Sequence, residues 1–125
     1  MASILVVDDE AGIRELLSDV LVLDGHDVRA AADGAEALRH LDRGSFDVMI
    51  TDLRMPGSVG GMDLVRWCSS DAPEMEVIIL TAYGTVDTAV EAMKLGAFDY
   101  LQKPIGSPAD LRNAVARALE RRAVG

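Results

Sequence analysis

The stretch VMITDLRMPG, residues 48–57, contains the most informative transition in this chain of 125 residues. Its first half is apolar and rich in branched residues, which is typical of a strand buried on both faces of a sheet. The apolar run ends at Asp52, and Pro56 and Gly57 follow closely. A turn alone could end the strand, and a carboxylate at a buried position is costly unless it has a partner. The stretch therefore predicts a buried strand that ends in a functional acid.

Four further segments predict the other strands of a sheet. ILVV (4–7) and VIIL (77–80) are continuous apolar runs like VMI (48–50), so they predict central strands. DVRAA (27–31) and FDYL (98–101) are half polar, so they predict strands at the two edges.

Apolar residues between the strands recur at the spacing of helices. The recurring residues are Ile13, Leu16, Leu17, Val20 and Leu21, then Val86, Ala89, Val90 and Met93, and finally Leu111, Val115 and Ala118. DGAE (33–36) predicts a capping box, and SPAD (107–110) predicts a serine cap followed by a proline in the first turn. Helix ends are predicted at Gly25, Gly44 and Gly96.

This alternation of strand and helix, repeated five times, predicts one α/β domain over residues 1–125. Helices should cover both faces of a doubly wound parallel sheet. No linker, low-complexity run or internal repeat interrupts the pattern. The last helix is expected at about 108–122, where Arg121 and Arg122 could lead into a linker and an effector domain.

The charge of the chain argues against a nucleic-acid partner. The sequence has 21 acidic and 12 basic residues, a net charge of −9, which repels phosphate backbones. Residues 104–125 are locally basic, with four arginines and two acids. A charge run of this kind predicts a solvated helix face rather than a docking surface.

The sequence also favours a soluble, cytoplasmic protein with no membrane partner. It has no apolar stretch long enough to span a bilayer and no basic flank before an apolar run at its start. Its single cysteine, Cys68, permits no internal disulfide and fits a reducing compartment. We interpret Cys68 as a small hydrophobe on a helix.

Four of the five predicted strands end in side chains that carry chemistry. Ligands of open α/β sheets bind beyond the carboxyl ends of the strands, where the strand order reverses. One acid after a strand usually caps the next helix, but that reading does not explain four strand ends together. The ends carry Asp8, Asp9 and Glu10, then Asp52, then Thr81, and finally Lys103.

Several carboxylates in one crevice repel one another unless a cation compensates them. Oxygen ligands that are too few for a calcium cage suit Mg²⁺, which keeps waters and takes further ligands from a phosphate. Lys103 and Thr81 could then contact phosphoryl oxygens as a mobile positive charge and a hydroxyl donor. We infer that Asp52 is a nucleophile that forms an acyl phosphate.

Four motifs in this order resemble the receiver domain of two-component response regulators. They are VVDDE (6–10), DLRMPG (52–57), TAYG (81–84) and LQKP (101–104). The resemblance covers essentially the whole chain, and the segment from Thr81 to Pro104 is similar to receivers of nitrogen-regulator-type transcriptional activators. It implies a flavodoxin-like fold with strand order 2-1-3-4-5 and five helices.

The resemblance also implies roles for individual residues. A sensor histidine kinase would donate the phosphoryl group to Asp52. Mg²⁺ would be held by Asp9, Asp52 and the main-chain carbonyl of Arg54, with Asp8 helping through water. The domain would catalyse only its own phosphorylation and dephosphorylation, so it would not be an enzyme that acts on a separate substrate.

A conformational switch is the second implication of the resemblance. Thr81 and Lys103 would bind the phosphoryl group, and Tyr100 would follow the position of Thr81. The surface of the fourth helix, fifth strand and fifth helix would then change and form a phosphorylation-dependent homodimer that controls transcription.

The chain departs from the family pattern at several positions. The loop GSVGGMDL (57–64) is one residue longer than usual, which predicts a looser loop beside the metal. Ile105 stands where an aromatic residue is common in the family. The peptide bond before Pro104, in contrast, is expected to be cis as in the family. Arg54 and Tyr83 are large residues two positions after Asp52 and Thr81, where they would flank the acyl phosphate and obstruct water.

Three other functions fit parts of the sequence. A Mg²⁺-dependent phosphatase of the haloacid-dehalogenase type needs a second Asp two residues after its nucleophile, where this chain has Arg54. A flavin-binding protein would need hydroxyls and amides for the flavin phosphate, where this chain has Asp8, Asp9 and Glu10. A phosphorylation-independent adaptor would not need the complete set of site residues.

Overall fold

Five parallel strands form one sheet in a computed structural model that describes residues 1–82 and 86–124. The strands are β1 (Ser3–Val7), β2 (Asp27–Ala31), β3 (Val48–Asp52), β4 (Glu76–Thr81) and β5 (Asp99–Gln102). Their order is β2-β1-β3-β4-β5, so the two half-polar segments are the edges and the predicted order is confirmed. The fifth strand begins at Asp99, one residue later than predicted.

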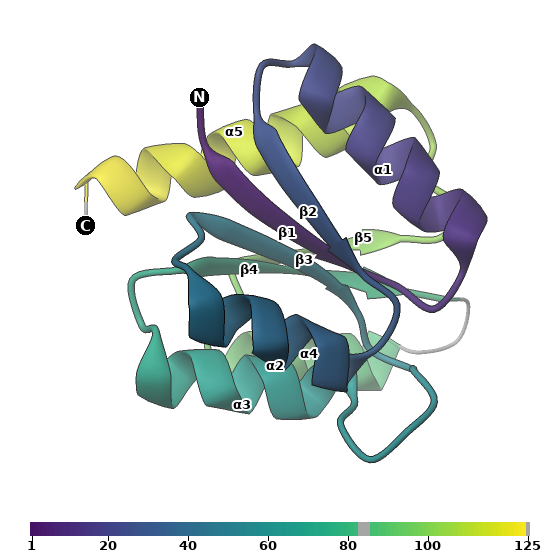
Figure 1. Cartoon of the computed structure of the whole chain (residues 1–125), viewed down its shortest axis with the longest axis vertical. Helices are drawn as coiled ribbons and strands as arrows, with labels where there is room; N and C mark the ends of the chain where they lie inside the picture. The colour runs from purple at the N-terminus through teal and green to yellow at the C-terminus, as the bar shows by residue number, and fades with distance from the viewer. Residues whose placement is uncertain (83–85, 125) are drawn as a thin grey trace.

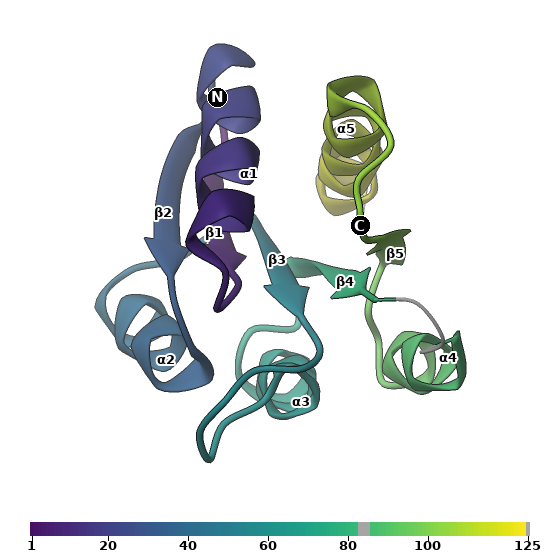
Figure 2. The same cartoon turned by 90° about the vertical axis from the view of Figure 1, so that its right-hand side faces the viewer.

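Helices cover both faces of the sheet, as predicted. One face carries α1 (Ala11–Leu23) and α5 (Pro108–Val124), and the other carries α2 (Gly34–Arg43), α3 (Gly61–Asp71) and α4 (Val86–Lys94) (Figure 1). Figure 2 shows this two-against-three arrangement from the side where the strand arrows point toward the viewer. None of the described helices is both long and apolar enough to cross a membrane.

Side-chain alternation along the strands divides the core into two layers. Met49 and Ile79 belong to the cluster beneath α2, α3 and α4, whereas their neighbours Ile50 and Ile78 belong to the cluster beneath α1 and α5. All four side chains are fully buried. Burial of each contributes about 1.5–3 kcal/mol to the free energy of folding, so the two layers hold the central strands rigidly.

The predicted helix signals are present with one difference in detail. Asp33 caps α2 by accepting a hydrogen bond from the Glu36 N–H at 2.8 Å. The Glu36 carboxylate, however, accepts from the N–H of Ala32 at 2.6 Å, one residue before the cap, so the reciprocal bond of a capping box is shifted. Gly25 and Gly96 end their helices with φ values of +90° and +116°, a backbone region that favours glycine.

Three apolar residues of the predicted helical stripes face solvent. The exposed fractions are 44% for Leu16, 47% for Val90 and 36% for Met93. The buried side of α4 is formed instead by the small residues Ala89 and Ala92. This helix therefore packs closely on the sheet and leaves larger apolar side chains on its outer side.

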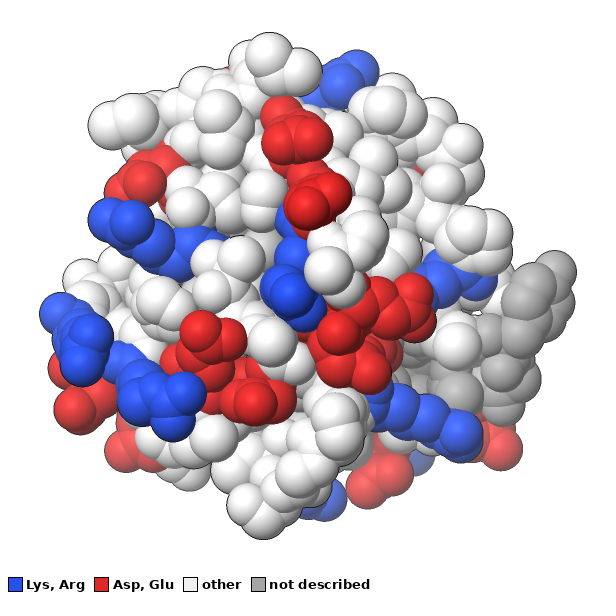
Figure 3. Space-filling view, turned by 45° about the vertical axis from the view of Figure 1, so that its right-hand side comes forward, with Lys and Arg blue, Asp and Glu red and all other residues white. Residues whose placement is uncertain are grey.

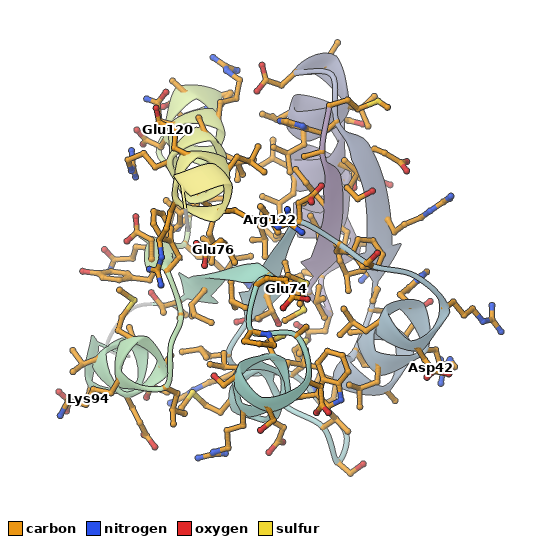
Figure 4. All side chains as sticks on the ribbon, turned by 90° about the vertical axis from the view of Figure 1, so that its left-hand side faces the viewer. Asp42, Glu74, Glu76, Lys94, Glu120 and Arg122 are labelled. Carbon is orange, nitrogen blue, oxygen red and sulfur yellow. The ribbon has the colours of Figure 1, made fainter. Side chains whose placement is uncertain are left out.

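The arginines of the basic run at the end of the chain are exposed, as its composition predicts. Three of them also form ion pairs with acids in or next to strands, which composition alone does not reveal. The pairs are Arg117 with Asp99 at 3.2 Å, Arg121 with Glu76 at 3.1 Å and Arg122 with Asp47 at 3.2 Å. Figure 4 shows Arg122 and Glu76 at the end of the sheet where α5 finishes. The last turns of α5 are therefore tied to the strands by charge.

The loop between β3 and α3 is packed against its neighbours rather than loose. A Cβ atom added to Gly34, at the start of α2, would lie only 2.3 Å from the main-chain oxygen of Val59 in this loop. A Cβ atom added to Gly61 would lie 2.1 Å from the main-chain oxygen of Asp52. Two glycines thus allow the longer loop to dock directly on α2 and on the end of β3.

Substitution of Gly34 tests this packing. Gly34→Ala should lower the free energy of unfolding by about 1–3 kcal/mol, because the new methyl group overlaps the backbone of Val59. Gly12→Ala in α1 is the matched control, since no atom lies within 4 Å of a Cβ atom there. The control should be neutral or stabilising by up to about 1 kcal/mol. Urea unfolding of both variants measures the difference, and equal stabilities would contradict the docking.

Candidate functional site

The carboxyl ends of β1, β3 and β5 bring three charged side chains together. Asp8, Asp52 and Lys103 lie on the face covered by α1 and α5, because the residue two positions before each of them belongs to that core. Asp8 is fully buried, Asp52 is 6% exposed, and the Lys103 side chain is 13% exposed. The sequence prediction that these strand ends converge is correct for all three residues.

The ammonium group of Lys103 lies between two buried carboxylates. Its Nζ atom is 2.7 Å from Oδ2 of Asp8 and 3.0 Å from Oδ2 of Asp52. The exposed carboxylate of Glu10 is more distant, at 3.9 Å. Figure 3 shows acidic side chains gathered next to basic ones near the centre of the visible face. One cation therefore joins the ends of three strands.

Burial and charge act in opposite directions on the ionisation of this cluster. Burial raises the pKa of the Asp52 carboxyl, and the hydrogen bond and charge of Lys103 offset this effect only in part. Burial also lowers the pKa of Lys103, but its hydrogen bonds and charge interactions with Asp8 and Asp52 together leave that pKa raised. Lys103 is therefore fully protonated at neutral pH and stabilises both carboxylates.

Three consecutive acids surround the mouth of the site. Asp8, Asp9 and Glu10 each offer a carboxylate oxygen, and these oxygens lie within 4.8 Å of one another. Oδ1 of Asp8 accepts a hydrogen bond from the Glu10 N–H at 2.9 Å. Its Oδ2 atom has the Lys103 ion pair but no hydrogen bond of regular geometry among the described residues. A buried oxygen with spare acceptor capacity thus points into the site.

This set of oxygens fits a hard divalent cation. Asp8, Glu10 and Asp52 lie within 4.0 Å of the Lys103 ammonium, and Asp9 adds a fourth carboxylate next to Asp8 and Glu10. A divalent cation would offset the remaining negative charge, and carboxylate oxygens are the ligands that Mg²⁺ prefers. Asp9 is exposed, so such an ion could retain water molecules on its outer side.

The backbone after β3 is positioned by a hydrogen bond to the carboxylate of Asp52. The main-chain N–H of Arg54 donates a hydrogen bond to Oδ1 of Asp52 at 3.3 Å. This contact places the peptide of Arg54 beside the carboxylate, while its side chain is exposed. The main-chain N–H of Arg54 is therefore next to the site.

Thr81 and Tyr100 lie on the opposite face of the sheet from Asp52. Tyr100 is in register with Ile79, two residues before Thr81, so both side chains project toward the layer of α4. Thr81 is 4% exposed and Tyr100 is 45% exposed. The N–H of Lys103 donates to the main-chain oxygen of Thr81 at 2.7 Å, which links the two strand ends.

Two further sequence predictions concern Tyr83 and the peptide bond before Pro104. Tyr83, expected beside the phosphate, lies outside the described residues, as does the side chain of Val86. The bond between Lys103 and Pro104 is cis, as expected.

Arg14, in the first turns of α1, is a neighbour of the site that the sequence motifs do not indicate. Its Nη1 atom donates a hydrogen bond to the main-chain oxygen of Asp8 at 2.7 Å. The only signal in the sequence is a basic residue shortly after three acids, and that pattern does not distinguish a solvent-facing side chain from one that folds back.

Residues 4–116 match the model of the response regulator receiver domain family. The chain belongs to this family. The predicted fold and the resemblance read from the four motifs are both confirmed.

Curated relatives of this receiver domain are transcriptional regulators. It is 45% identical over 118 residues to the response regulator protein PilR of Pseudomonas aeruginosa. The alignment covers 94% of this chain and 26% of PilR. The domain is 43% identical over 122 residues to the transcriptional regulatory protein GlrR of Escherichia coli, covering 98% and 27% of the two chains. The chain therefore spans about a quarter of the length of these relatives.

Solved structures agree with this assignment. A response regulator receiver domain protein from Clostridium thermocellum superposes with a TM-score of 0.92 at 42% identity, over 99% of this chain and 98% of the other. NtrX from Brucella abortus in complex with ADP gives a TM-score of 0.94 at 34% identity, over 98% of this chain and 28% of NtrX. The receiver domain is thus of the kind found in NtrC-type regulators.

Removal of the central cation tests how the site is held together. Lys103→Met should lower the free energy of unfolding by about 3–5 kcal/mol, because Asp8 and Asp52 would remain buried without a partner. Adding Asp52→Asn to this variant should restore part of the loss, since one of the two charges disappears.

Urea unfolding with a chelator present measures both variants without a metal that could replace the ammonium. Lys94→Met is the control, because Lys94 is exposed in the last turn of α4 and its loss should change stability by less than about 0.5 kcal/mol. A Lys103 variant as stable as this control would show that the cation is not required.

Proposed function

We propose that this receiver domain is a phosphorylation-activated signalling switch that accepts a phosphoryl group on Asp52 from a sensor histidine kinase. The supporting observation is the protonated Lys103 between the buried carboxylates of Asp8 and Asp52 at the ends of three strands. A purely structural ion pair would need only one carboxylate. Two carboxylates on one ammonium, together with exposed acids at the mouth of the site, form the arrangement expected for phosphoryl transfer.

The chemistry requires a carboxylate that is fixed yet reactive. An oxygen of Asp52 attacks the phosphorus atom, and the new O–P bond forms as the P–N bond to the histidine of the kinase breaks. The released imidazole takes up a proton from solvent. Asp52 is held by Lys103 on one oxygen and by the Arg54 N–H on the other, so little reorientation is needed before attack.

Lys103 is suited to follow the negative charge as it moves. Its ammonium has three donors on a flexible stem, so it can leave the Asp52 oxygen at 3.0 Å for an oxygen of the phosphoryl group. Thr81, on the neighbouring strand end, would donate its hydroxyl to another phosphoryl oxygen.

Mg²⁺ is the proposed cofactor of this reaction. Asp9, Asp52 and the main-chain carbonyl of Arg54 would hold it directly, and Asp8 would act through water. When bound, the ion neutralises charge on the phosphoryl oxygens. The domain would promote only its own phosphorylation and dephosphorylation, and large side chains at Arg54 and Tyr83 would slow the attack of water.

The proposed output is a homodimer through α4, β5 and α5. This surface already exposes Val90, Met93 and Tyr100, which are apolar or aromatic. Thr81 moving toward the phosphate would leave space for Tyr100, whose ring would then exchange solvent for the protein interior. Burying that ring would change what the surface offers to a second copy.

The proposed biological context is control of transcription. The domain would cover residues 1–125 and receive the signal for an effector domain, as the lengths and names of the relatives suggest. The acidic charge of the chain, −9, argues against contact of this domain itself with DNA.

The proposed nucleophile is tested with a small phosphodonor. Incubation with acetyl phosphate and Mg²⁺ should add one phosphoryl group, read by intact mass, because Asp52 attacks and the metal reduces charge repulsion. Asp52→Asn or a chelator should abolish the gain. Labelling that survives Asp52→Asn, or that maps to a serine or histidine, would eliminate the mechanism. A parent protein that takes up no phosphate would favour an adaptor that works without phosphorylation.

The proposed switch is tested by Thr81→Ala. A hydrogen bond to a charged phosphoryl group contributes about 1.5–3 kcal/mol, whereas a swing of populations from 1:99 to 99:1 needs about 5.5 kcal/mol. The variant should therefore still accept phosphate on Asp52 yet lose most phosphate-dependent association. Sedimentation with and without phosphodonor measures this effect. Full dimerisation of phosphorylated Thr81→Ala would disprove the coupling and leave the phosphorylation chemistry untouched.

A further inference from the structure

One positively charged side chain contacts the acidic loop without forming an ion pair there. Arg14 projects from α1, and its Nη1 atom donates a hydrogen bond to the main-chain oxygen of Asp8 at 2.7 Å. The partner is a carbonyl, although three carboxylates follow one another in this loop. Arg14 thus contacts the backbone of the loop rather than neutralising one of its acids.

The carbonyl of Asp8 needs such a donor because the sheet does not supply one. The Asp8 N–H still donates to Ala31, the last residue of β2, at 3.1 Å. The paired register of β1 and β2 ends at Val7 and Ala31, so among the described residues the ladder supplies no donor to the carbonyl of Asp8. Asp8 is fully buried, and a buried carbonyl without a donor costs free energy. The side chain of Arg14 therefore donates the hydrogen bond that a further residue of a neighbouring strand would otherwise supply.

This carbonyl belongs to the peptide that joins Asp8 to Asp9. Fixing the oxygen fixes the plane of the peptide and hence the direction in which the chain reaches Asp9. Two further bonds close the loop, from the Glu10 N–H to Oδ1 of Asp8 at 2.9 Å and from the Arg14 N–H to the Glu10 oxygen at 3.1 Å. Arg14 is thus a side chain from outside the loop that contacts its backbone, whereas Lys103 contacts its carboxylates.

We propose that Arg14 is a positioning residue that holds the Asp8–Asp9–Glu10 loop in the shape required to bind a divalent cation. This inference rests on the proposed metal site but adds a residue to it. Arg14 would not be a ligand of the ion, and it would act through the backbone of Asp8 on the carboxylate of Asp9.

Electrostatics and positioning predict opposite effects of removing this arginine. A cation near a metal site repels the metal, so loss of the charge alone should tighten binding. Loss of the hydrogen bond should instead let the loop relax and weaken binding. Removal of an outer partner of a metal ligand typically reduces affinity about 10–100-fold. The sign of the change therefore separates the two roles.

The test measures Mn²⁺ affinity by electron paramagnetic resonance of the free ion, with Mn²⁺ as a paramagnetic probe for Mg²⁺. Arg14→Met should bind about tenfold more weakly than the parent. Arg14→Lys keeps a charged donor that can reach the same carbonyl, so it should recover at least half of the loss on a logarithmic scale. Arg39→Met is the charge control, because Arg39 is exposed on α2. It should bind as tightly as the parent.

Each outcome has a definite reading once circular dichroism has shown that the variants are folded. Binding by Arg14→Met that equals or exceeds that of the parent would overturn the inference, and so would an Arg14→Lys variant as weak as Arg14→Met. A parent protein that does not bind Mn²⁺ would overturn the proposed metal site itself. The failure of the positioning role and the failure of the proposed function are thus distinguishable.

Discussion

One ammonium group shared by two buried carboxylates is the constraint on which the rest of the structure depends. Burial raises the pKa of the Asp52 carboxyl and Lys103 offsets part of this rise, while the hydrogen bonds and charges of Asp8 and Asp52 raise the pKa of Lys103. The parallel register brings the ends of β1 and β3 side by side, because Val7 pairs with Thr51 directly before Asp8 and Asp52. Lys103 lies two residues beyond Leu101, which is level with Asp52 across β4, so its long side chain spans the remaining distance.

The alternation of side chains along the strands places two groups of site residues on opposite faces of the sheet. The charged cluster lies on the face of α1 and α5, whereas Thr81 and Tyr100 lie on the face of α4. In the proposed switch, a signal between them would cross the sheet at its edge. The hydrogen bond from the Lys103 N–H to the Thr81 oxygen is a direct link at that edge, since it joins the residue that contacts Asp52 to the strand that carries Thr81.

Features that depend on strand ends and periodicity could be predicted from the sequence, because local patterns determine them. The edge strands and the convergence of Asp8, Asp52 and Lys103 belong to this class, whereas the strand order is implied by the resemblance to the receiver family. Features that depend on long side chains could not. Arg14 and the arginines of α5 look like solvated charge in sequence, and only the fold brings their partners within reach. The exposed Val90 and Met93 show that periodicity predicts a helix better than the depth of its burial.

The contact of Gly34 with Val59 has a consequence for how such a domain can change over generations. Its nearest atom is the main-chain oxygen of Val59, so a smaller side chain at position 59 would not make room for a methyl group at position 34. Only a different path of the loop would. The path of that loop and the glycine are therefore sterically coupled, and a change that moved the loop away would also release the constraint on the first residue of α2.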